Sequence, residues 1–247
     1  MSVWNFLRLD LLLSDQALKG QKMRTRIKIC GMTRIEDVDS AVNAGADAVG
    51  FVFHPSSKRF VTAQQGADLV RQLPAFVSSV ALFVHPEPST VHEVLNVMRP
   101  TLLQFHGEET PEFCESFDMP YIKAFRVGAP GMDTPQSLVT ACQRFRSACA
   151  WLFDSYTPAY GGSGHSFDHG LLIGLTALAP SESRPLILSG GMKASNLEDP
   201  VRRLRPWAVD VSSGVEIEPG IKSAALIDAF VSAVEKADRS ALLTSQG

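Results

Sequence analysis

The sequence lacks the cysteine and histidine spacings that disulfide frameworks and metal sites require. Its 247 residues hold four cysteines, with no C-x-x-C pair and no cysteine–histidine ligand spacing. The six histidines form no H-E-x-x-H pattern. We therefore expect neither a disulfide scaffold nor a bound metal, and a reducing, cytoplasmic compartment fits best.

Long hydrophobic runs and a large net charge are also missing. No segment approaches 18 uncharged apolar residues, so no membrane span is expected. A net charge of -3 and a pI near 6.1 argue against a general nucleic-acid or membrane-surface binder. An anionic ligand must then be held by local groups.

The chain ends carry little information about function. Residues 1–22 contain a leucine-rich stretch, but Asp10 interrupts it and no basic run precedes it, unlike a signal peptide. We predict that residues 1–22 are an extension, which is either disordered or lies ahead of the true start. Residues 23–240 would form the catalytic domain and residues 241–247 a tail.

From Thr25 onward, short apolar runs alternate with stretches of helical period. The expected strands are RIKIC (26–30), DAVGFVF (47–53), SSVALFV (78–84), LLQF (102–105), YIKAF (121–125), ACAWLFD (148–154), PLILS (185–189) and AVDVS (208–212). The expected helices are 35–45, 63–73, 87–98, 111–117, 135–147, 167–177, 195–204 and 221–237. Eight strand–helix units without a linker predict a single-domain α/β protein, a (β/α)8 TIM barrel, with a doubly wound open sheet as the alternative.

Local sequence also predicts where several helices begin. Ser/Thr-x-x-Glu/Gln capping boxes, or a threonine followed by proline, mark five starts. They are Thr33–Glu36, Thr62–Gln65, Ser195–Glu198, Thr110-Pro111 and Thr134-Pro135.

In such a barrel the active site lies where strands end and the following loops begin. Cys30 ends the first strand there, and it is either a small buried hydrophobe or a base or nucleophile. Cys114, Cys142 and Cys149 are expected to be buried and inert. Cys30 is therefore the candidate reactive thiol.

Other polar residues follow the same strand ends. Asp154 either caps a loop or exchanges protons, and Arg59 either faces solvent or binds a carboxylate. Gln104, His106 and Asp210 also fall near strand ends, where His106 and Asp210 would orient neighbours rather than react. An acid and a base on opposite sides of the mouth indicate proton transfer.

Glycine-rich loops follow the last three strands. Barrels often bind phosphate at the loops after strands 7 and 8, through backbone N–H groups and a helix N-terminus. Gly190-Gly191 and Ser212–Gly214 occupy these two places, and Gly161–Gly164 follows strand 6. Each glycine pair alone is typical of a simple turn, but together they favour a phosphorylated substrate.

Six segments in order carry a resemblance to a known family. They are KICGMTR, GADAVGFVFHPSSKR, LLQFHGEE, FDSYTPAYGGSG, LSGGM and AVDVSSGVE. Together they resemble phosphoribosylanthranilate isomerase of tryptophan biosynthesis, in register from about Arg26 to Ala237. His169 departs from the family, whose members often carry tryptophan there.

The resemblance implies a cofactor-free (β/α)8 barrel that acts on a phosphorylated small molecule. It implies Cys30 as general base, Asp154 as general acid and Arg59 as the ligand of the anthranilate carboxylate. It also implies phosphate contacts at Gly190, Gly191, Ser213 and Gly214, with Gly161 and Gly162 in the loop that closes nearby. From their place at strand ends we further predict that Gln104, His106 and Asp210 contact the substrate. No nucleic acid or membrane partner is implied, and the assembly would be a monomer or a homodimer.

Three alternatives stay open at this point. A related histidine-pathway isomerase would use an aspartate where Cys30 stands. Indoleglycerol-phosphate synthase would need a lysine set that the sequence does not offer. A non-catalytic binding protein would need neither Cys30 nor Asp154.

Overall fold

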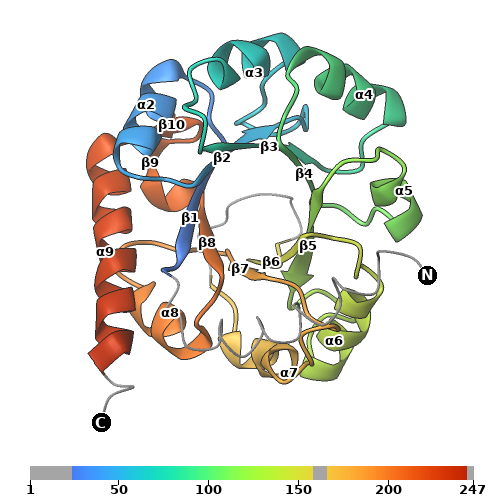
Figure 1. The fold of residues 1–247 in the computed structure, drawn as a ribbon, viewed down its shortest axis with the longest axis vertical. Coiled ribbons are helices and arrows are strands. Elements are labelled where there is room, and N and C mark those ends of the chain that lie inside the picture. Colours follow the sequence, from blue (N-terminus) through green and yellow to red (C-terminus); the bar gives the residue numbers. More distant parts are fainter. Residues whose placement is uncertain (1–23, 158–165, 244–247) are drawn as a thin grey trace, which may run out of the picture.

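The computed structural model describes residues 24–157 and 166–243, and these form a closed parallel barrel of eight strands surrounded by helices (Figure 1). The strands are β1 (Arg26–Cys30), β2 (Ala48–Val52), β3 (Ser78–Phe83), β4 (Leu102–Phe105), β5 (Tyr121–Val127), β6 (Ala150–Ser155), β7 (Leu186–Leu188) and β8 (Ala208–Val211). Strand β1 pairs with both β2 and β8, which closes the barrel. The expected TIM barrel is confirmed, and the open sheet is excluded.

Strand register decides which side chains enter the barrel. Cys30 pairs with Gly50 and Arg126 with Asp154, and side chains alternate between the two faces of each strand. A small interior layer includes Val80, Ile122 and Leu152. Polar inward-facing residues then follow toward the carboxyl ends of the strands, where the mouth opens.

The outer faces of the strands pack against the helices and form the main core. Phe105 stacks on Phe83 at 6.2 Å between ring centroids, and Phe125 stacks on Phe153 at 5.7 Å. The helices are α2 (Ile35–Asn43), α3 (Ala63–Val70), α4 (Pro88–Val97), α5 (Pro111–Glu115), α6 (Pro135–Gln143), α7 (Ile173–Thr176), α8 (Glu198–Leu204) and α9 (Ala224–Leu243), with 3-10 turns η2 (His169–Leu172) and η3 (Ser213–Val215). The sixth expected helix is thus only the short η2–α7 pair.

Three of the five expected helix starts are confirmed. Thr62, Thr110 and Thr134 each accept a hydrogen bond from a backbone N–H in the first turn. The other two, at Thr33 and Ser195, are wrong: the residues that cap these helices are Arg34 and Leu197, and neither makes a side-chain cap. The Thr33 hydroxyl instead donates to the carbonyl of Gly220, a contact that local sequence cannot reveal.

A small antiparallel hairpin follows β8. It consists of β9 (Glu216–Glu218) and β10 (Ile221–Lys222), and it precedes α9 beside β1 (Figure 1). The predicted helix over 221–237 therefore begins later, at Ala224. It also ends later, at Leu243, beyond the boundary expected at residue 240.

Two predictions concern chain segments outside the described residues. These are the extension at 1–22 and the glycines at 161–164, and most of the tail predicted over 241–247 lies outside them as well. Within the described ranges, no helix is both long enough and apolar enough to cross a membrane. Among the same residues no group of three or more His, Cys, Asp or Glu side chains is arranged to hold a metal ion.

Candidate active site

A pocket opens in the barrel mouth at the carboxyl ends of the strands. Its wall includes both residues that the sequence singles out for proton transfer, Cys30 and Asp154. The other predicted residues that line it are Arg59, His106, Asp210, Gly190, Gly191, Ser213 and Gly214. The sequence-based candidates from six different strand ends thus come together in one place.

Cys30 lies beside a buried ion pair. Lys28, two residues earlier on β1, faces the same side and binds Asp210 of β8 at 2.7 Å. Ser189 also donates to Asp210, at 3.1 Å. Asp210 therefore lines the pocket but is already bound by two side chains.

A glycine on the neighbouring strand makes room for this thiol. A Cβ at Gly50 would lie 2.7 Å from Sγ of Cys30 and 3.2 Å from Nζ of Lys28. The first distance is too short for any side chain, and the second requires the lysine end to move by a few tenths of an ångström. The absence of a side chain at Gly50 is thus what allows Cys30 and Lys28 to face inward together.

The charge state of Cys30 is set by opposing effects. Burial raises the pKa of the Cys30 thiol above its usual value. The ammonium groups of Lys28 and Lys222 oppose this effect, while the Asp210 carboxylate adds to it, and the net shift is upward. The thiolate therefore depends on the two lysines.

Asp154 reaches the pocket from the end of β6 and contacts a histidine. Its Oδ2 lies 3.1 Å from Nε2 of His106, while its Oδ1 accepts from the backbone N–H of Ser155. The amide of Gln104 lies 3.1 Å from the other ring nitrogen of His106. Gln104 is fully buried and does not line the pocket, so it contacts His106 from below.

The two loops expected to bind phosphate follow β7 and β8, and β8 is the neighbour of β1, the strand that ends in Cys30. Gly190 and Gly191 both have positive φ, 85° and 63°, which favours glycine. A Cβ at Gly190 would lie 2.7 Å from the backbone nitrogen of Ser155, and one at Gly214 would lie 2.0 Å from the carbonyl oxygen of Met192. Gly190 thus lets the loop after β7 pack against the end of β6, and Gly214 lets the loop after β8 pack against the loop after β7.

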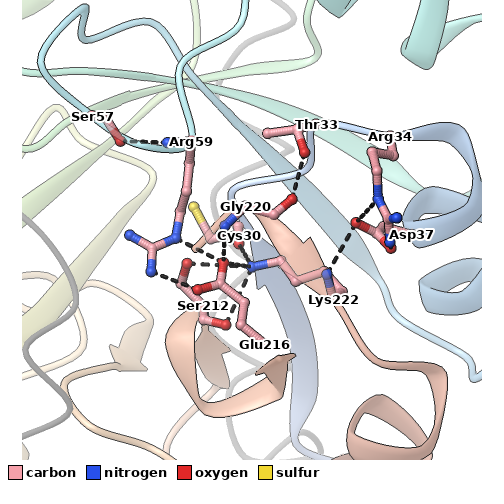
Figure 2. Close-up of polar contacts among 10 residues, drawn as sticks. All are labelled: Cys30, Thr33, Arg34, Asp37, Ser57, Arg59, Ser212, Glu216, Gly220 and Lys222. Atoms are coloured by element: carbon pink, nitrogen blue, oxygen red, sulfur yellow. Dashed lines mark hydrogen bonds and ion pairs between the residues drawn. The ribbon is translucent and has the colours of Figure 1, made fainter. Parts of the chain in front are cut away.

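Arg59 lines the pocket from the loop after β2, and its guanidinium is already paired with a carboxylate. Its Nε and Nη2 donate to the two carboxylate oxygens of Glu216 at 2.8 and 2.7 Å. The Glu216 carboxylate also binds Nζ of Lys222 at 2.8 Å, so it lies between two cations (Figure 2). Burial alone would raise the pKa of Glu216, but these contacts with Arg59 and Lys222 hold it below its usual value.

Lys222 joins the hairpin to the barrel. Its Nζ donates to the carbonyl oxygen of Cys30 at 2.6 Å and to that of Ser212 at 3.2 Å. Its own side chain is fully buried, and burial lowers its pKa despite the nearby Glu216. The ends of β1 and β8 are therefore held together by one ammonium group.

An apolar surface completes the pocket next to Cys30. Val52, Leu82 and Val84 form a small buried cluster with the thiol and line the same cavity. Val52 ends β2, Leu82 lies in β3 and Val84 directly follows β3. A flat, partly apolar ligand could pack against this surface while its charged groups reach the loops.

The family model for N-(5'-phosphoribosyl)anthranilate isomerase matches residues 27–233, which is nearly the whole described barrel. The chain belongs to this family. It is an isomerase of tryptophan biosynthesis that acts on N-(5'-phosphoribosyl)anthranilate.

Relatives of the same name agree with this assignment. The isomerase of Bordetella parapertussis is 54% identical over 217 residues, covering 88% of this chain and 99% of the relative. That of Dechloromonas aromatica is 49% identical over 218 residues, covering 88% and 100%. The similarity therefore spans the full length of these isomerases.

Solved isomerase structures share the fold. The Thermotoga maritima structure is 37% identical and covers 86% of this chain and 99% of its own, with a TM-score of 0.76. Another isomerase structure holds reduced 1-(o-carboxyphenylamino)-1-deoxyribulose 5-phosphate, at 34% identity, the same two coverages and a TM-score of 0.73.

Sequence reasoning about this isomerase missed the residues that support the site. Lys28, Gly50, Glu216 and Lys222 all contact or make room for a predicted site residue. The period of two along β1 is a signal that places Lys28 beside Cys30, and the polar pattern after β8 marks Glu216. No local signal reveals Lys222, because its partners are as many as 192 residues away.

The predictions for the remaining cysteines had mixed outcomes. Cys114 and Cys142 are buried, as expected, but Cys149 is exposed. Its thiol contacts the carbonyl oxygen of Tyr121 at 3.0 Å, at the end where β6 begins. The prediction that Cys149 is buried was therefore wrong, because it precedes the strand rather than lying within it.

Proposed function

We propose that this pocket carries out an Amadori rearrangement, converting N-(5'-phosphoribosyl)anthranilate to 1-(2-carboxyphenylamino)-1-deoxyribulose 5-phosphate. The observation that carries the proposal is that Cys30 and Asp154 line one pocket together with both glycine-rich loops. The substrate has a phosphate at one end and a carboxylate at the other, and the wall offers a group for each.

Asp154 is the proposed general acid. It protonates the ring oxygen of the ribose, which breaks the C1–O bond and leaves a protonated Schiff base between C1 and the anthranilate nitrogen. For this step Asp154 must hold the proton and Nε2 of His106 must accept its hydrogen bond. That tautomer places the ring proton of His106 on Nδ1, so the Gln104 amide must turn its oxygen, which has no partner among the described residues, toward the ring in place of its nitrogen.

Cys30 is the proposed general base. Its thiolate removes the proton from C2, and the electron pair moves into the C1–C2 bond while the iminium nitrogen becomes an amine. The enolamine then takes a proton at C1 and loses the hydroxyl proton at C2, which gives the ketose. The positive charge of Lys28, beside Cys30 on the inner face of β1, stabilises the thiolate that starts this step.

The phosphate is proposed to lie between Gly190-Gly191 and Ser213-Gly214. The backbone N–H groups of Gly190 and Gly191 donate to no other described residue, which leaves them available for an anion. Gly161 and Gly162 stay a prediction, since they fall outside the described residues. Arg59 would bind the anthranilate carboxylate, and the apolar surface at Val52 would contact the ring.

The experiment follows the loss of substrate fluorescence on mixing with freshly generated phosphoribosylanthranilate. We expect Cys30→Ala and Asp154→Asn each to lower kcat by about 10²- to 10⁴-fold, while the reduced product analogue still binds. Cys149→Ala and Asp199→Asn are the matched controls, because both residues are exposed and away from the pocket. Equal turnover by Cys30→Ala and the wild-type enzyme would exclude the base assignment.

We also propose a reducing cytoplasmic location and a monomer or homodimer without nucleic acid or membrane partners. All four cysteines are free, which suits a reducing compartment. One solved structure concerns monomers generated from the dimeric isomerase of Thermotoga maritima. Sedimentation of this chain will distinguish the two assemblies.

A further inference from the structure

Glu216 acts on the pocket from outside it. Arg59 belongs to the pocket wall, whereas neither Glu216 nor Lys222 is among the described residues that line it. The Glu216 carboxylate binds the guanidinium through Nε and Nη2, and it also accepts from the backbone N–H of Gly220 at 3.3 Å (Figure 2). Glu216 therefore lies behind Arg59.

This contact uses only one edge of the guanidinium. A guanidinium offers five N–H donors, and its end-on edge, between Nη1 and Nη2, suits a carboxylate bound through two hydrogen bonds. Within the described part of the chain, Nη1 of Arg59 makes no hydrogen bond. The edge that remains is thus the one suited to a second carboxylate.

Space around Arg59 restricts its movement. A Cβ at Gly31 would lie 2.4 Å from Cδ of Arg59, so the arginine stem fills the place of a side chain there. The Arg59 side chain is 13% exposed, that of Glu216 is 5% exposed and that of Lys222 is fully buried. A long side chain that is packed and paired in this way has already lost most of its rotamer entropy before a ligand arrives.

Without a ligand, the buried group of Arg59, Glu216 and Lys222 has a net charge. While Cys30 is a neutral thiol, the two cations Arg59 and Lys222 and the one anion Glu216 leave one positive charge in a mostly buried place. Buried charges are stable only when they are paired. One carboxylate, and not a larger anion of higher charge, would make the group neutral.

We propose that Glu216 is a positioning residue for substrate recognition: it fixes Arg59 so that the end-on edge of the guanidinium receives the anthranilate carboxylate. Lys222 balances the charge of Glu216 and fixes it in turn. The inference rests on the proposed role of Arg59 as the carboxylate ligand. It adds that the selectivity for a substrate with one carboxylate is set by a residue that never touches the substrate.

The test compares two ligands in calorimetric binding. One is reduced 1-(o-carboxyphenylamino)-1-deoxyribulose 5-phosphate, and the other is the same molecule with a plain phenylamino group. The variant is Glu216→Asp, which keeps the charge but is one methylene too short to span Arg59 and Lys222 together. Glu218→Asp is the matched control, since Glu218 is exposed on the same strand, β9.

We expect Glu216→Asp to raise the Kd of the carboxylate ligand by about three- to tenfold, the cost of ordering one long side chain anew. The Kd of the phenylamino ligand should not change. In an Arg59→Met background the Glu216→Asp effect should disappear, because Glu216 acts through Arg59. Glu218→Asp should bind both ligands like the wild-type enzyme.

Each other result overturns the inference in a distinguishable way. Equal weakening of both ligands, or an effect that persists with Arg59→Met, would make Glu216 a general support of the mouth. If Arg59→Met weakens only the carboxylate ligand while Glu216→Asp changes nothing, the positioning role fails and the role of Arg59 stands. If Arg59→Met binds both ligands like the wild type, the role of Arg59 fails as well.

Discussion

At the scale of single residues, the chemistry of the site depends on groups next to the predicted ones. Cys30 ends a strand at the mouth, but burial raises the pKa of its thiol. The nearest compensating charge is Lys28, whose own ammonium is held by Asp210. The reactivity of Cys30 is therefore a property of the Lys28–Cys30–Asp210 group as a whole.

The first residue-scale prediction concerns the pH dependence of catalysis. Since the base must be a thiolate and its pKa is raised, kcat/KM of the wild-type enzyme should still rise with pH above about 8.5, the usual pKa of a thiol. Lys28→Met removes a positive charge, so the thiolate is less stable, its pKa rises further and the alkaline limb moves to higher pH.

The measurement is kcat/KM against pH, together with the ultraviolet absorbance of the thiolate, with Cys30→Ala as the blank. If kcat/KM rises at the same alkaline pH in Lys28→Met as in the wild-type enzyme, this lysine does not act on the thiol. The Glu218→Gln variant, which changes an exposed charge, should leave the profile unchanged.

A second residue-scale prediction concerns Gly50. Its substitution by alanine places a methyl group 2.7 Å from Sγ of Cys30 and 3.2 Å from its Cα, so the thiol must move. We expect kcat to fall at least about tenfold, since small misplacements of a reacting group are costly. The stability cost should be about 1–3 kcal/mol, as for other overpacked sites.

Gly66→Ala is the matched control for this experiment. A Cβ at Gly66 would also be crowded, at 3.0 Å from Sδ of Met98 and 3.1 Å from Cζ of Phe53, but it lies in α3 and does not line the pocket. It should lower stability by a similar or smaller amount with unchanged kcat. Unchanged turnover in Gly50→Ala would show that the position of Cys30 is not critical.

At the scale of elements, the β9–β10 hairpin connects the last barrel strand to the first. Lys222 on β10 binds carbonyl oxygens at the ends of β1 and β8 and the carboxylate of Glu216. The backbone N–H of Lys222 also donates to Asp37 of α2. The hairpin thus holds together β1 and β8, the two strands whose pairing closes the barrel.

The element-scale prediction compares a buried ion pair with an exposed one. Lys222→Met leaves Glu216 with one cation instead of two and leaves two carbonyl oxygens without a donor. We expect the free energy of unfolding to fall by about 1–3 kcal/mol, the cost of leaving these buried carbonyl oxygens unsatisfied while Glu216 keeps its pairing with Arg59.

Lys236→Met is the control, because Lys236 pairs with Glu198 on the surface, where both side chains are about half exposed or more. Its effect should be below about 1 kcal/mol. Denaturant unfolding of both variants provides the measurement. Similar values for the two variants would mean that the hairpin does not stabilise the barrel.

At the scale of the whole molecule, the closed barrel buries thiols that titrate only on unfolding. Burial raises the pKa of Cys142 on α6 and raises that of Cys114 to about 12. Above the usual thiol pKa the unfolded chain loses these protons while the folded chain keeps them. Stability that is fully present below that pH is therefore lost as the pH rises.

The whole-molecule prediction is an alkaline decline in stability that depends on these thiols. Cys142→Ala should lose less stability between pH 8 and 10 than the wild-type enzyme, by about 1–2 kcal/mol. Its stability at pH 7 should be lower, because a small cavity replaces the thiol.

Thermal melting as a function of pH provides the measurement, and the slope rather than the absolute Tm is compared. Thr140→Ala, on the exposed face of the same helix, should keep the wild-type slope. Identical slopes in Cys142→Ala and the wild type would show that this thiol does not contribute.

The sequence by itself determined the barrel and the place of its chemistry. Strand and helix periodicity are local, and eight alternating units of this kind have few ways to bury their apolar faces. The parallel order then puts Cys30, Asp154 and the glycine loops at one end of the barrel. For the same reason the Thr62, Thr110 and Thr134 caps follow from a few neighbouring residues.

Only the tertiary structure decided which side chains meet. The caps expected at Thr33 and Ser195 do not form, and Thr33 binds Gly220, 187 residues away. Gln104 lies below the pocket and contacts His106 instead of lining the wall. Arg59 pairs with Glu216 across 157 residues of chain, and Lys222 joins strands that become neighbours only when the barrel closes. Such contacts have no local signature, because closure and register, and not the adjoining sequence, fix the distances between these atoms.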